Sequence, residues 1–222
     1  MVSLFKKNAS FFIPYLLFLL VCGSLLVFYS KVEMHSYINR YHCPSADFFF
    51  SYWTNLGLGI MIIPVILILA FVRFRYVLIS FIGFLITVTI NDSLKAIFHS
   101  ARPVTVFSWL GESLYLVPNV EMYSWNSFPS GHAATGFCMF CLLSFYTKNN
   151  FLKTIYFLIA LLVSYSRMYL SEHFLQDIYA GSLIGICSAI LTYSWIMNGR
   201  IFTKFAGRLD KPLISLKRNN LP

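Results

Sequence analysis

Six long apolar runs constrain the fold of this chain more than any other feature of its sequence. None of them contains a charged residue. A helix of about 20 mostly apolar residues crosses the ~30 Å hydrocarbon core of a bilayer and satisfies its own backbone hydrogen bonds there. Hydrophobic residues make up 58% of the sequence and charged residues 11%, which does not suit a water-soluble domain. We therefore expect an all-α integral membrane protein with about six transmembrane helices, over Phe11–Tyr29, Leu56–Val72, Tyr76–Ile90, Ala133–Tyr146, Ile155–Ser166 and Ile178–Met197.

The third, fourth and fifth runs are shorter than a full membrane crossing, so we expect their helices to continue into the polar flanks. The first run follows Lys6 and Lys7, but it is too long for a signal peptide and lacks a small-residue cleavage site, which predicts a retained anchor. No internal repeat, low-complexity tract or long linker divides the chain. One membrane domain over 1–222 is therefore predicted, with a motif core over 95–177.

Basic residues are distributed unevenly between the connections of this six-helix scheme. The connections on the side of the two termini hold twelve Lys and Arg and one acid, whereas the opposite connections hold five Lys and Arg and seven acids. Because Lys and Arg collect on the cytoplasmic side of membrane proteins, we expect both termini to be cytoplasmic. The basic residues form no continuous patch, which argues against nucleic acid as a partner, and no feature indicates the oligomeric state.

Histidines and cysteines are also distributed asymmetrically. All five histidines fall on the non-cytoplasmic side, namely His35, His42, His99, His132 and His173. This asymmetry predicts a functional site there. Cys43 is the one cysteine in an outer connection, so we expect no intrachain disulfide in an oxidising compartment.

The first stretch that carries chemistry runs from Lys95 to Pro103, at the outer end of the third run. Lys95 and Arg102 are seven residues apart, a spacing that returns to nearly the same helical face about two turns on, so both long cationic side chains can converge on one anion. Pro103 disfavours helix at the preceding residue and opens the outer loop. Taken alone, such residues usually extend to lipid headgroups at a membrane boundary.

The second stretch is Pro129-Ser130-Gly131-His132, directly before the fourth run. The start of a helix exposes unpaired N–H groups and a partial positive charge, which suits phosphate. Gly131 allows close approach of the backbone, Ser130 can cap the helix, and His132 lies in its first turn. An ordinary serine cap beside a boundary histidine fits this stretch equally well.

The third stretch joins the fifth and sixth runs and contains Ser166, Arg167, His173 and Asp177. If the backbone is helical from His173 onward, Asp177 lies one turn away and can accept a proton from one ring nitrogen. The other nitrogen is then free to act as a nucleophile. A single such pair is more often structural than catalytic, but an arginine and a second histidine nearby favour a catalytic site.

Together the three stretches resemble the K-x6-R-P, PSGH and S-R-x5-H-x3-D motifs of the type 2 phosphatidic acid phosphatase (PAP2) superfamily. All eleven fixed positions are present and in order between Lys95 and Asp177. The resemblance implies a membrane phosphatase whose active site lies at the periplasmic ends of the helices. It implies a phosphate cradle formed by Lys95, Arg102, Ser130, Gly131 and Arg167, and a catalytic set of His173 as nucleophile, Asp177 as its orienting carboxylate and His132 as general acid.

This mechanism requires no cofactor and no metal ion. The outer acids show no paired ligand spacing, although a site made of three histidines remains an alternative. The superfamily also contains soluble vanadium haloperoxidases, against which six apolar runs argue. A non-catalytic carrier of lipids or anions would need the cations but not His173 and Asp177, so the intact pair favours an enzyme.

The substrate is predicted to be a phosphorylated membrane lipid. The compact chain resembles small bacterial members of the superfamily, which implies a location in the bacterial inner membrane and several possible lipids: lipid A, undecaprenyl diphosphate, phosphatidylglycerol phosphate or phosphatidic acid. An aromatic-rich outer loop over 104–128 suits a bulky glycolipid headgroup, so we favour lipid A, with undecaprenyl diphosphate second. An aromatic belt at the membrane surface is the alternative interpretation of that loop. Transfer of phosphate between lipids would use the same residues as hydrolysis.

Overall fold

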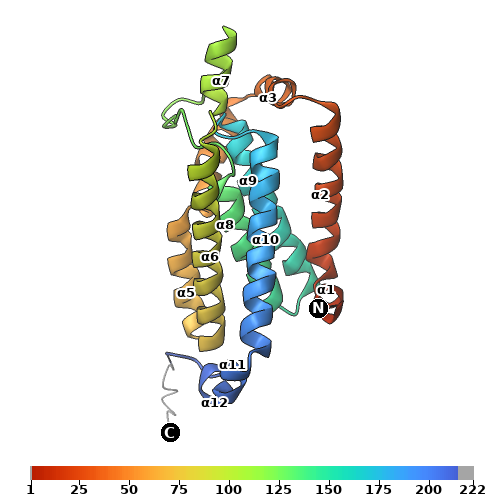
Figure 1. Cartoon of the computed structure of the whole chain (residues 1–222), viewed down its shortest axis with the longest axis vertical. Coiled ribbons are helices and arrows are strands. Elements are labelled where there is room, and N and C mark those ends of the chain that lie inside the picture. The colour runs from red at the N-terminus through yellow and green to blue at the C-terminus, as the bar shows by residue number, and fades with distance from the viewer. Residues whose placement is uncertain (1, 215–222) are drawn as a thin grey trace.

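The computed structural model describes residues 2–214, and these form a bundle of helices without a strand (Figure 1). The bundle consists of α2 (Ala9–Phe28), α5 (Ile62–Ala70), α6 (Phe74–Phe98), α8 (Gly131–Tyr146), α9 (Asn150–Tyr169) and α10 (Leu175–Asn198). Shorter elements lie at its ends: α1 (Val2–Lys7), α3 (Lys31–Asn39), α4 (Pro44–Trp53), η1 (Thr54–Gly57), η2 (Gly59–Met61), α7 (Pro103–Leu110), α11 (Arg200–Lys204) and α12 (Ala206–Leu209). The expected all-α architecture is confirmed.

Each of the six apolar runs lies mainly on one of the bundle helices, and the chain is a multi-pass integral membrane protein. Four stretches are long and apolar enough to cross a membrane: Ala9–Phe28, Phe74–Leu110, Asn150–Tyr169 and Leu175–Asn198. The pair Pro44–Gly57 and Gly59–Ala70 makes a fifth crossing if it is counted as one broken span, bent by 62°. The expectation of one helix over Leu56–Val72 is therefore wrong, because two short 3-10 turns precede α5. Of the three short runs, those on α6 and α9 continue into polar flanks as expected, whereas α8 begins only two residues before its run and ends with it, so that expectation is wrong for the fourth run.

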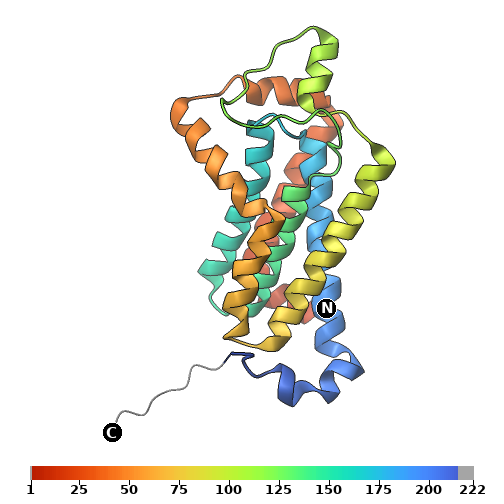
Figure 2. The same cartoon turned by 90° about the vertical axis from the view of Figure 1, so that its left-hand side faces the viewer.

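The sixth bundle helix, α8, is too short to cross a bilayer alone but lies in the centre of the bundle (Figure 2). It packs against α6, α9 and α10. Its contact with α10 is close because a Cβ atom at Gly181 or Gly185 would clash with carbonyl oxygens of the α8 segment. Small residues allow helices in membranes to approach in this way. α8 is therefore held by protein on most sides, and its N-terminus is fixed relative to α10.

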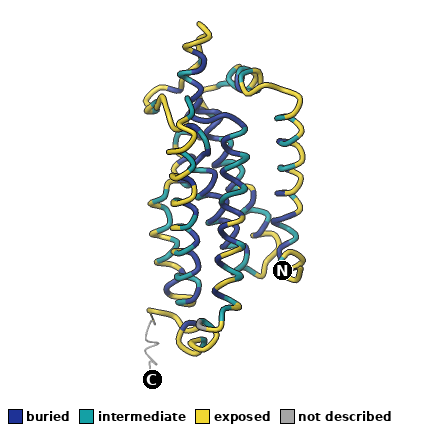
Figure 3. Tube along the Cα trace, viewed as in Figure 1, coloured by how far each residue is buried: buried dark blue, intermediate teal, exposed yellow. Residues whose placement is uncertain are grey.

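Lipid-facing side chains are concentrated on the outer helices. α2 exposes Ile13, Leu16, Leu20 and Val27, whereas its Phe11 is fully buried against the core (Figure 3). Exposed apolar residues need no partner in hydrocarbon, because lipid tails are as apolar as leucine. The buried carboxylates and histidines of the described residues, namely His35, Asp47, Glu172, His173 and Asp177, lie instead in α3, in α4 and around the α9–α10 connection.

The two ends of the bundle differ in content. α1, α11 and α12 lie at one end, and α3 and α7 lie at the other (Figures 1 and 2). Arg75 secures the first end, since its Nε atom pairs with Asp210 at 2.8 Å. The connections that were predicted to share the basic side of the membrane lie at this end. Two of their basic residues, Lys217 and Arg218, fall outside the described residues. Which end faces the cytoplasm stays a prediction.

Candidate active site

The three motifs meet at the end of the bundle that carries α3 and α7. The backbone N–H of Ser130 donates to the carbonyl oxygen of Asp177 at 3.0 Å, which joins the second motif to the third. Lys95 lies in the last turn of α6, beside the start of α8: a Cβ atom added to Gly131 would be 3.9 Å from its Nζ atom. Residues from all three stretches therefore surround the N-terminus of α8.

Lys95 and Arg102 do not share a helical face, and that expectation is wrong. α6 ends at Phe98, and His99 follows in the left-handed region with φ 39°. Arg102 is extended because Pro103 disfavours helical backbone before it, and it forms the N-cap of α7. The two cations therefore approach the site from different elements rather than along one helix.

The start of α8 has the predicted form. Ser130 is the N-cap, and its side chain accepts from the N–H of Ala133 at 3.5 Å, while His132 lies in the first turn. The first N–H groups of a helix have no intrahelical partner and carry partial positive charge. This terminus can therefore donate to a phosphate oxygen.

His173 and Asp177 lie together, though not on a shared helix. His173 precedes α10, and Asp177 lies in the first turn, where its carboxylate accepts from the N–H of Phe174 at 2.9 Å and from the hydroxyl of Ser127 at 2.6 Å. The Nδ1 atom of His173 is 3.5 Å from Asp177 Oδ2, too long for a strong hydrogen bond. Such contacts often tighten when a substrate binds. The carboxylate is fixed by two other donors and faces one ring nitrogen.

Burial governs the protonation of His173. The residue is 1% exposed, and burial lowers its pKa to about 4, against the raising effect of Asp177. His173 is therefore neutral near pH 7, as a nitrogen nucleophile must be.

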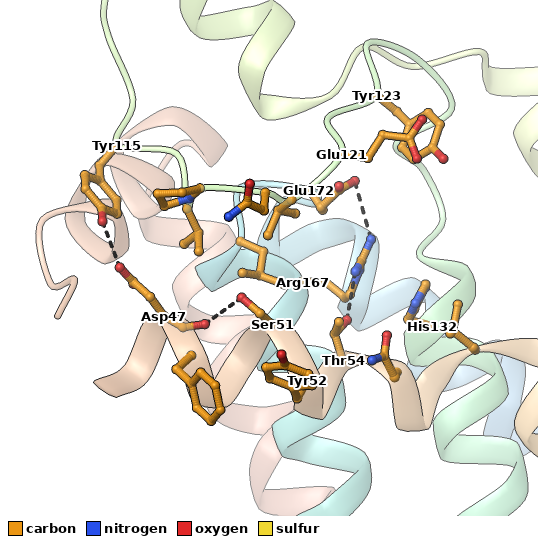
Figure 4. A pocket seen from close by; sticks show the side chains of 18 of the residues that line it. Asp47, Ser51, Tyr52, Thr54, Tyr115, Glu121, Tyr123, His132, Arg167 and Glu172 are labelled. Atoms are coloured by element: carbon orange, nitrogen blue, oxygen red, sulfur yellow. Dashed lines mark hydrogen bonds and ion pairs between the residues drawn. The ribbon is translucent and has the colours of Figure 1, made fainter. Parts of the chain in front are cut away.

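Arg102 and Arg167 converge on one carboxylate, that of Glu172. Arg102 Nη1 donates to Glu172 Oε2, and Arg167 Nη2 is 3.4 Å from the same oxygen. Arg167 Nη1 also donates to the hydroxyl of Thr54 at 2.8 Å, so that the guanidinium lies between Thr54 and Glu172 (Figure 4). Arg102 is fixed by its Nε atom, which donates to the carbonyl of Trp125 at 2.9 Å. The two guanidinium groups can bind one anion together.

Two cavities open beside these groups, and His132 lines both. The larger has a volume of about 840 Å³ and reaches Arg167 and Glu172 from α4, η1 and the 115–123 loop (Figure 4). The smaller, of about 180 Å³, is lined by Lys95, Asn91 and Gly131 among others. We call the larger one the headgroup cavity. His132 therefore lies between a space with Lys95 and a larger space that can hold a bulky group.

The aromatic loop contributes to the wall of the headgroup cavity. Tyr115 donates to Asp47 at 2.8 Å, and the guanidinium carbon of Arg102 is 5.2 Å from the centre of the Tyr123 ring. Both tyrosines line the cavity, while Phe107 is buried in the core and Trp109 is exposed. The loop thus combines a cavity wall with the surface aromatics that a membrane belt would have.

Sequence reasoning missed Glu172, Ser127 and Thr54. Only position signalled the first two: Glu172 directly precedes His173, and Ser127 lies two residues before Pro129. Thr54 is distant from every motif in sequence, and only the fold brings it to Arg167. Within residues 2–214, no three His, Cys, Asp or Glu side chains are placed to hold a metal ion together.

Comparison with known proteins matches the part of the chain that contains all three motifs. Residues 76–201 match the PAP2 superfamily. The chain is 29% identical over 176 residues to an undecaprenyl-diphosphatase of Sulfolobus acidocaldarius, covering 77% of this chain and 81% of that protein. It is 27% identical over 156 residues to a lipid A 4'-phosphatase of Bacteroides thetaiotaomicron, covering 67% and 69%. The crystal structure of Aquifex aeolicus LpxE matches the fold with a TM-score of 0.66 and 31% identity, over 73% of this chain and 93% of that one.

Proposed function

The chain belongs to the PAP2 superfamily and is a membrane lipid phosphatase, and from that premise we propose that it removes phosphate from a lipid headgroup in the outer leaflet through a phosphohistidine at His173. The observation that carries this mechanism is the buried His173, neutral near pH 7 and facing a carboxylate fixed by two donors. The proposed enzyme is one membrane domain whose active site faces the periplasm of a bacterial cell.

The phosphate-binding groups are Lys95, Arg102, Ser130, Gly131 and Arg167. Their guanidinium and ammonium charges, with the N–H groups at the start of α8, stabilise negative charge on the phosphoryl oxygens. Cations aimed at these oxygens stabilise the transition state, where the attacking and leaving atoms lie in line with phosphorus.

Two displacements at phosphorus complete the reaction. In the first, the free ring nitrogen of His173 attacks phosphorus, and the bond from phosphorus to the lipid oxygen breaks. The imidazolium form of His132 gives a proton to that oxygen and becomes neutral, and Asp177 stabilises the positive charge on the ring of His173. In the second, water attacks phosphorus and returns a proton to His132, which releases inorganic phosphate and restores His173.

Lipid A is the substrate we favour, because the headgroup cavity suits a sugar better than a second phosphate. Among the described residues that line it, the carboxylates are those of Asp47, Glu121 and Glu172 and the one guanidinium group is that of Arg167. Glu172 also pairs with Arg102, so Asp47 and Glu121 are the carboxylates without an arginine partner in the cavity wall. Carboxylates accept hydrogen bonds from hydroxyl groups and repel a further phosphate. A volume of about 840 Å³ lies within the range that holds a ligand of drug size.

Undecaprenyl diphosphate is the second candidate, and one observation favours it. The undecaprenyl-diphosphatase of Sulfolobus acidocaldarius has a slightly higher identity to this chain than the lipid A 4'-phosphatase has. Phosphatidylglycerol phosphate and phosphatidic acid fit the same chemistry. Transfer of the phosphate to an acceptor lipid would differ only in replacing water in the second displacement.

Mass spectrometry of lipids from cells with and without the gene tests the substrate. Lipid A that lacks a phosphate only when the enzyme is produced supports the proposal. Unchanged lipid A with faster hydrolysis of undecaprenyl diphosphate would reject it in favour of the second candidate. Cells producing His173→Asn supply the control for a carrier without catalysis, since a carrier would keep its effect in that variant.

A further inference from the structure

We propose that Glu172 is an internal competitor for the substrate phosphate: its carboxylate takes the position between Arg102 and Arg167, is displaced when phosphate binds, and returns to help release inorganic phosphate. The inference rests on the proposed function, because it assumes that these two arginines bind the phosphate. It adds a residue that none of the three motifs contains.

The carboxylate of Glu172 contacts the two arginines as a bound phosphate would. Its side chain is 2% exposed, and its Oε2 atom pairs with both Arg102 Nη1 and Arg167 Nη2. A carboxylate and a phosphate use the same donors of a guanidinium group. Both ligands therefore compete for these nitrogen atoms.

Each arginine has one hydrogen bond that does not involve Glu172. Arg102 is fixed through the carbonyl of Trp125, and Arg167 is fixed through the hydroxyl of Thr54. The guanidinium groups can thus remain in place when the carboxylate leaves. The N–H groups that now donate to Glu172 can then donate to phosphate oxygens.

The headgroup cavity offers space for the displaced side chain of Glu172. Glu172 lines the headgroup cavity together with His132 and Arg167, whereas Arg102, His173 and Asp177 are not among the lining residues. The backbone of Glu172 stays anchored, since its N–H donates to the carbonyl of Arg167 at 2.9 Å. Rotation of the side chain into the cavity would free both arginines without moving His173, whose N–H donates to the same carbonyl at 3.1 Å.

A phosphatase benefits from such a competitor at the end of its cycle. Lys95, Arg102 and Arg167 would hold inorganic phosphate strongly in a buried site, because charge-assisted hydrogen bonds gain strength where water is excluded. As inorganic phosphate leaves, the carboxylate of Glu172 returns and again pairs with the two arginines. Glu172 therefore weakens the binding of substrate and product but speeds the release of product.

Inhibition by inorganic phosphate of purified full-length enzyme in detergent, at one fixed pH, tests this proposal. In Glu172→Gln the inhibition constant for phosphate and the KM should both fall by roughly tenfold or more, the range of a charge-assisted hydrogen bond. The value of kcat should fall as phosphate release slows, while a first-turnover burst is kept. Glu121→Gln, which removes another carboxylate of the same cavity, is the matched control and should change the inhibition constant by less than about threefold.

An unchanged or raised inhibition constant in Glu172→Gln would overturn the proposal, since a carboxylate that only positions the arginines would weaken phosphate binding when lost. If that variant does not fold, Glu172→Asp serves, because its shorter side chain reaches the arginines less well and should shift the constant in the same direction by less. Arg102→Ala separates this failure from failure of the proposed function. If phosphate inhibits Arg102→Ala as well as it inhibits the unmodified enzyme, the phosphate site itself is wrong.

Discussion

Replacing Asp177 with asparagine should lower the rate of phosphoenzyme formation by about 10²–10³ while leaving the fold in place. Asparagine has the same shape, and its carbonyl oxygen can still accept from the N–H of Phe174 and the hydroxyl of Ser127. What it loses is the negative charge that faces His173. The substitution therefore isolates the electrostatic contribution of the carboxylate.

The magnitude follows from the geometry of the pair. Both side chains are at most 2% exposed, and Asp177 Oδ2 is 3.5 Å from His173 Nδ1. Two unit charges at that distance attract by about 5 kcal/mol at an effective dielectric constant of about 20, which corresponds to a rate factor of about 10³–10⁴ for a fully developed charge. The transition state carries part of that charge, so about 10²–10³ is expected.

The assay is rapid quenching of acid-labile phosphoenzyme formed from radiolabelled p-nitrophenyl phosphate. His173→Asn should form none and sets the background. Ser127→Ala is the matched control, because it removes a hydroxyl that donates to the same carboxylate but leaves the charge. It should cost about 1.5–3 kcal/mol of unfolding free energy and less than about tenfold in rate.

Two results would refute this reasoning. If Asp177→Asn loses less than about tenfold in the first step, the charge does not stabilise the ring of His173. If Asp177→Asn and Ser127→Ala lose equal rate, the carboxylate acts only by holding the local structure. If His173→Asn still forms phosphoenzyme, His173 is not the nucleophile.

Three further predictions concern catalysis, stability and topology. His132→Ala should lose about 10²–10⁴-fold in the first step on a glycolipid phosphate but distinctly less on p-nitrophenyl phosphate, whose leaving group needs little proton transfer; equal losses in the burst on both substrates would reject the general acid role. Burial lowers the pKa of His35 and of His173 to about 4, below the ordinary value of about 6.5 that each has in the unfolded chain. The free energy of unfolding should therefore be highest above pH 6.5 and fall by up to about 3 kcal/mol per histidine as the pH drops toward 4, because the unfolded chain binds protons first. Thermal unfolding in detergent should show a weaker pH dependence in His35→Gln, and parallel curves would contradict the assignment. Cys43 is exposed, so a membrane-impermeant thiol reagent should label it in intact spheroplasts; labelling only after lysis, with Cys43→Ser as the control, would place the site on the cytoplasmic side.

Periodicity predicted much of the fold, and the motifs predicted which residues the fold brings together at the candidate site. Apolar runs predicted the bundle because lipid leaves few alternatives to a helix. The start of α8 was predictable because Ser130 is a common N-cap residue with a specific local function. Both inferences depend on interactions within a few residues of the chain.

Features that depend on distant contacts were not predictable. The helix containing Lys95 ends at Phe98 rather than continuing to Arg102, and the bend before α5 interrupts the second apolar run. Apolar composition does not fix where a helix breaks when tertiary packing can satisfy the backbone. The contact of Thr54 with Arg167 joins positions 113 residues apart, and no local pattern indicates it.

The chemistry and the choice of substrate are carried by different parts of this chain. Every residue proposed to act on phosphate lies within 76–201, the segment that matches the superfamily. The α4–η1 side of the headgroup cavity, with its polar residues Asp47, Ser51 and Asn55, lies before that segment. An undecaprenyl-diphosphatase and a lipid A 4'-phosphatase match this chain at similar identity. We propose that the shared motifs bind the phosphate that all such substrates have in common, so the motifs do not distinguish the groups attached to it. Substrate identity must therefore be argued from the charges and volume of the headgroup cavity rather than from the motifs.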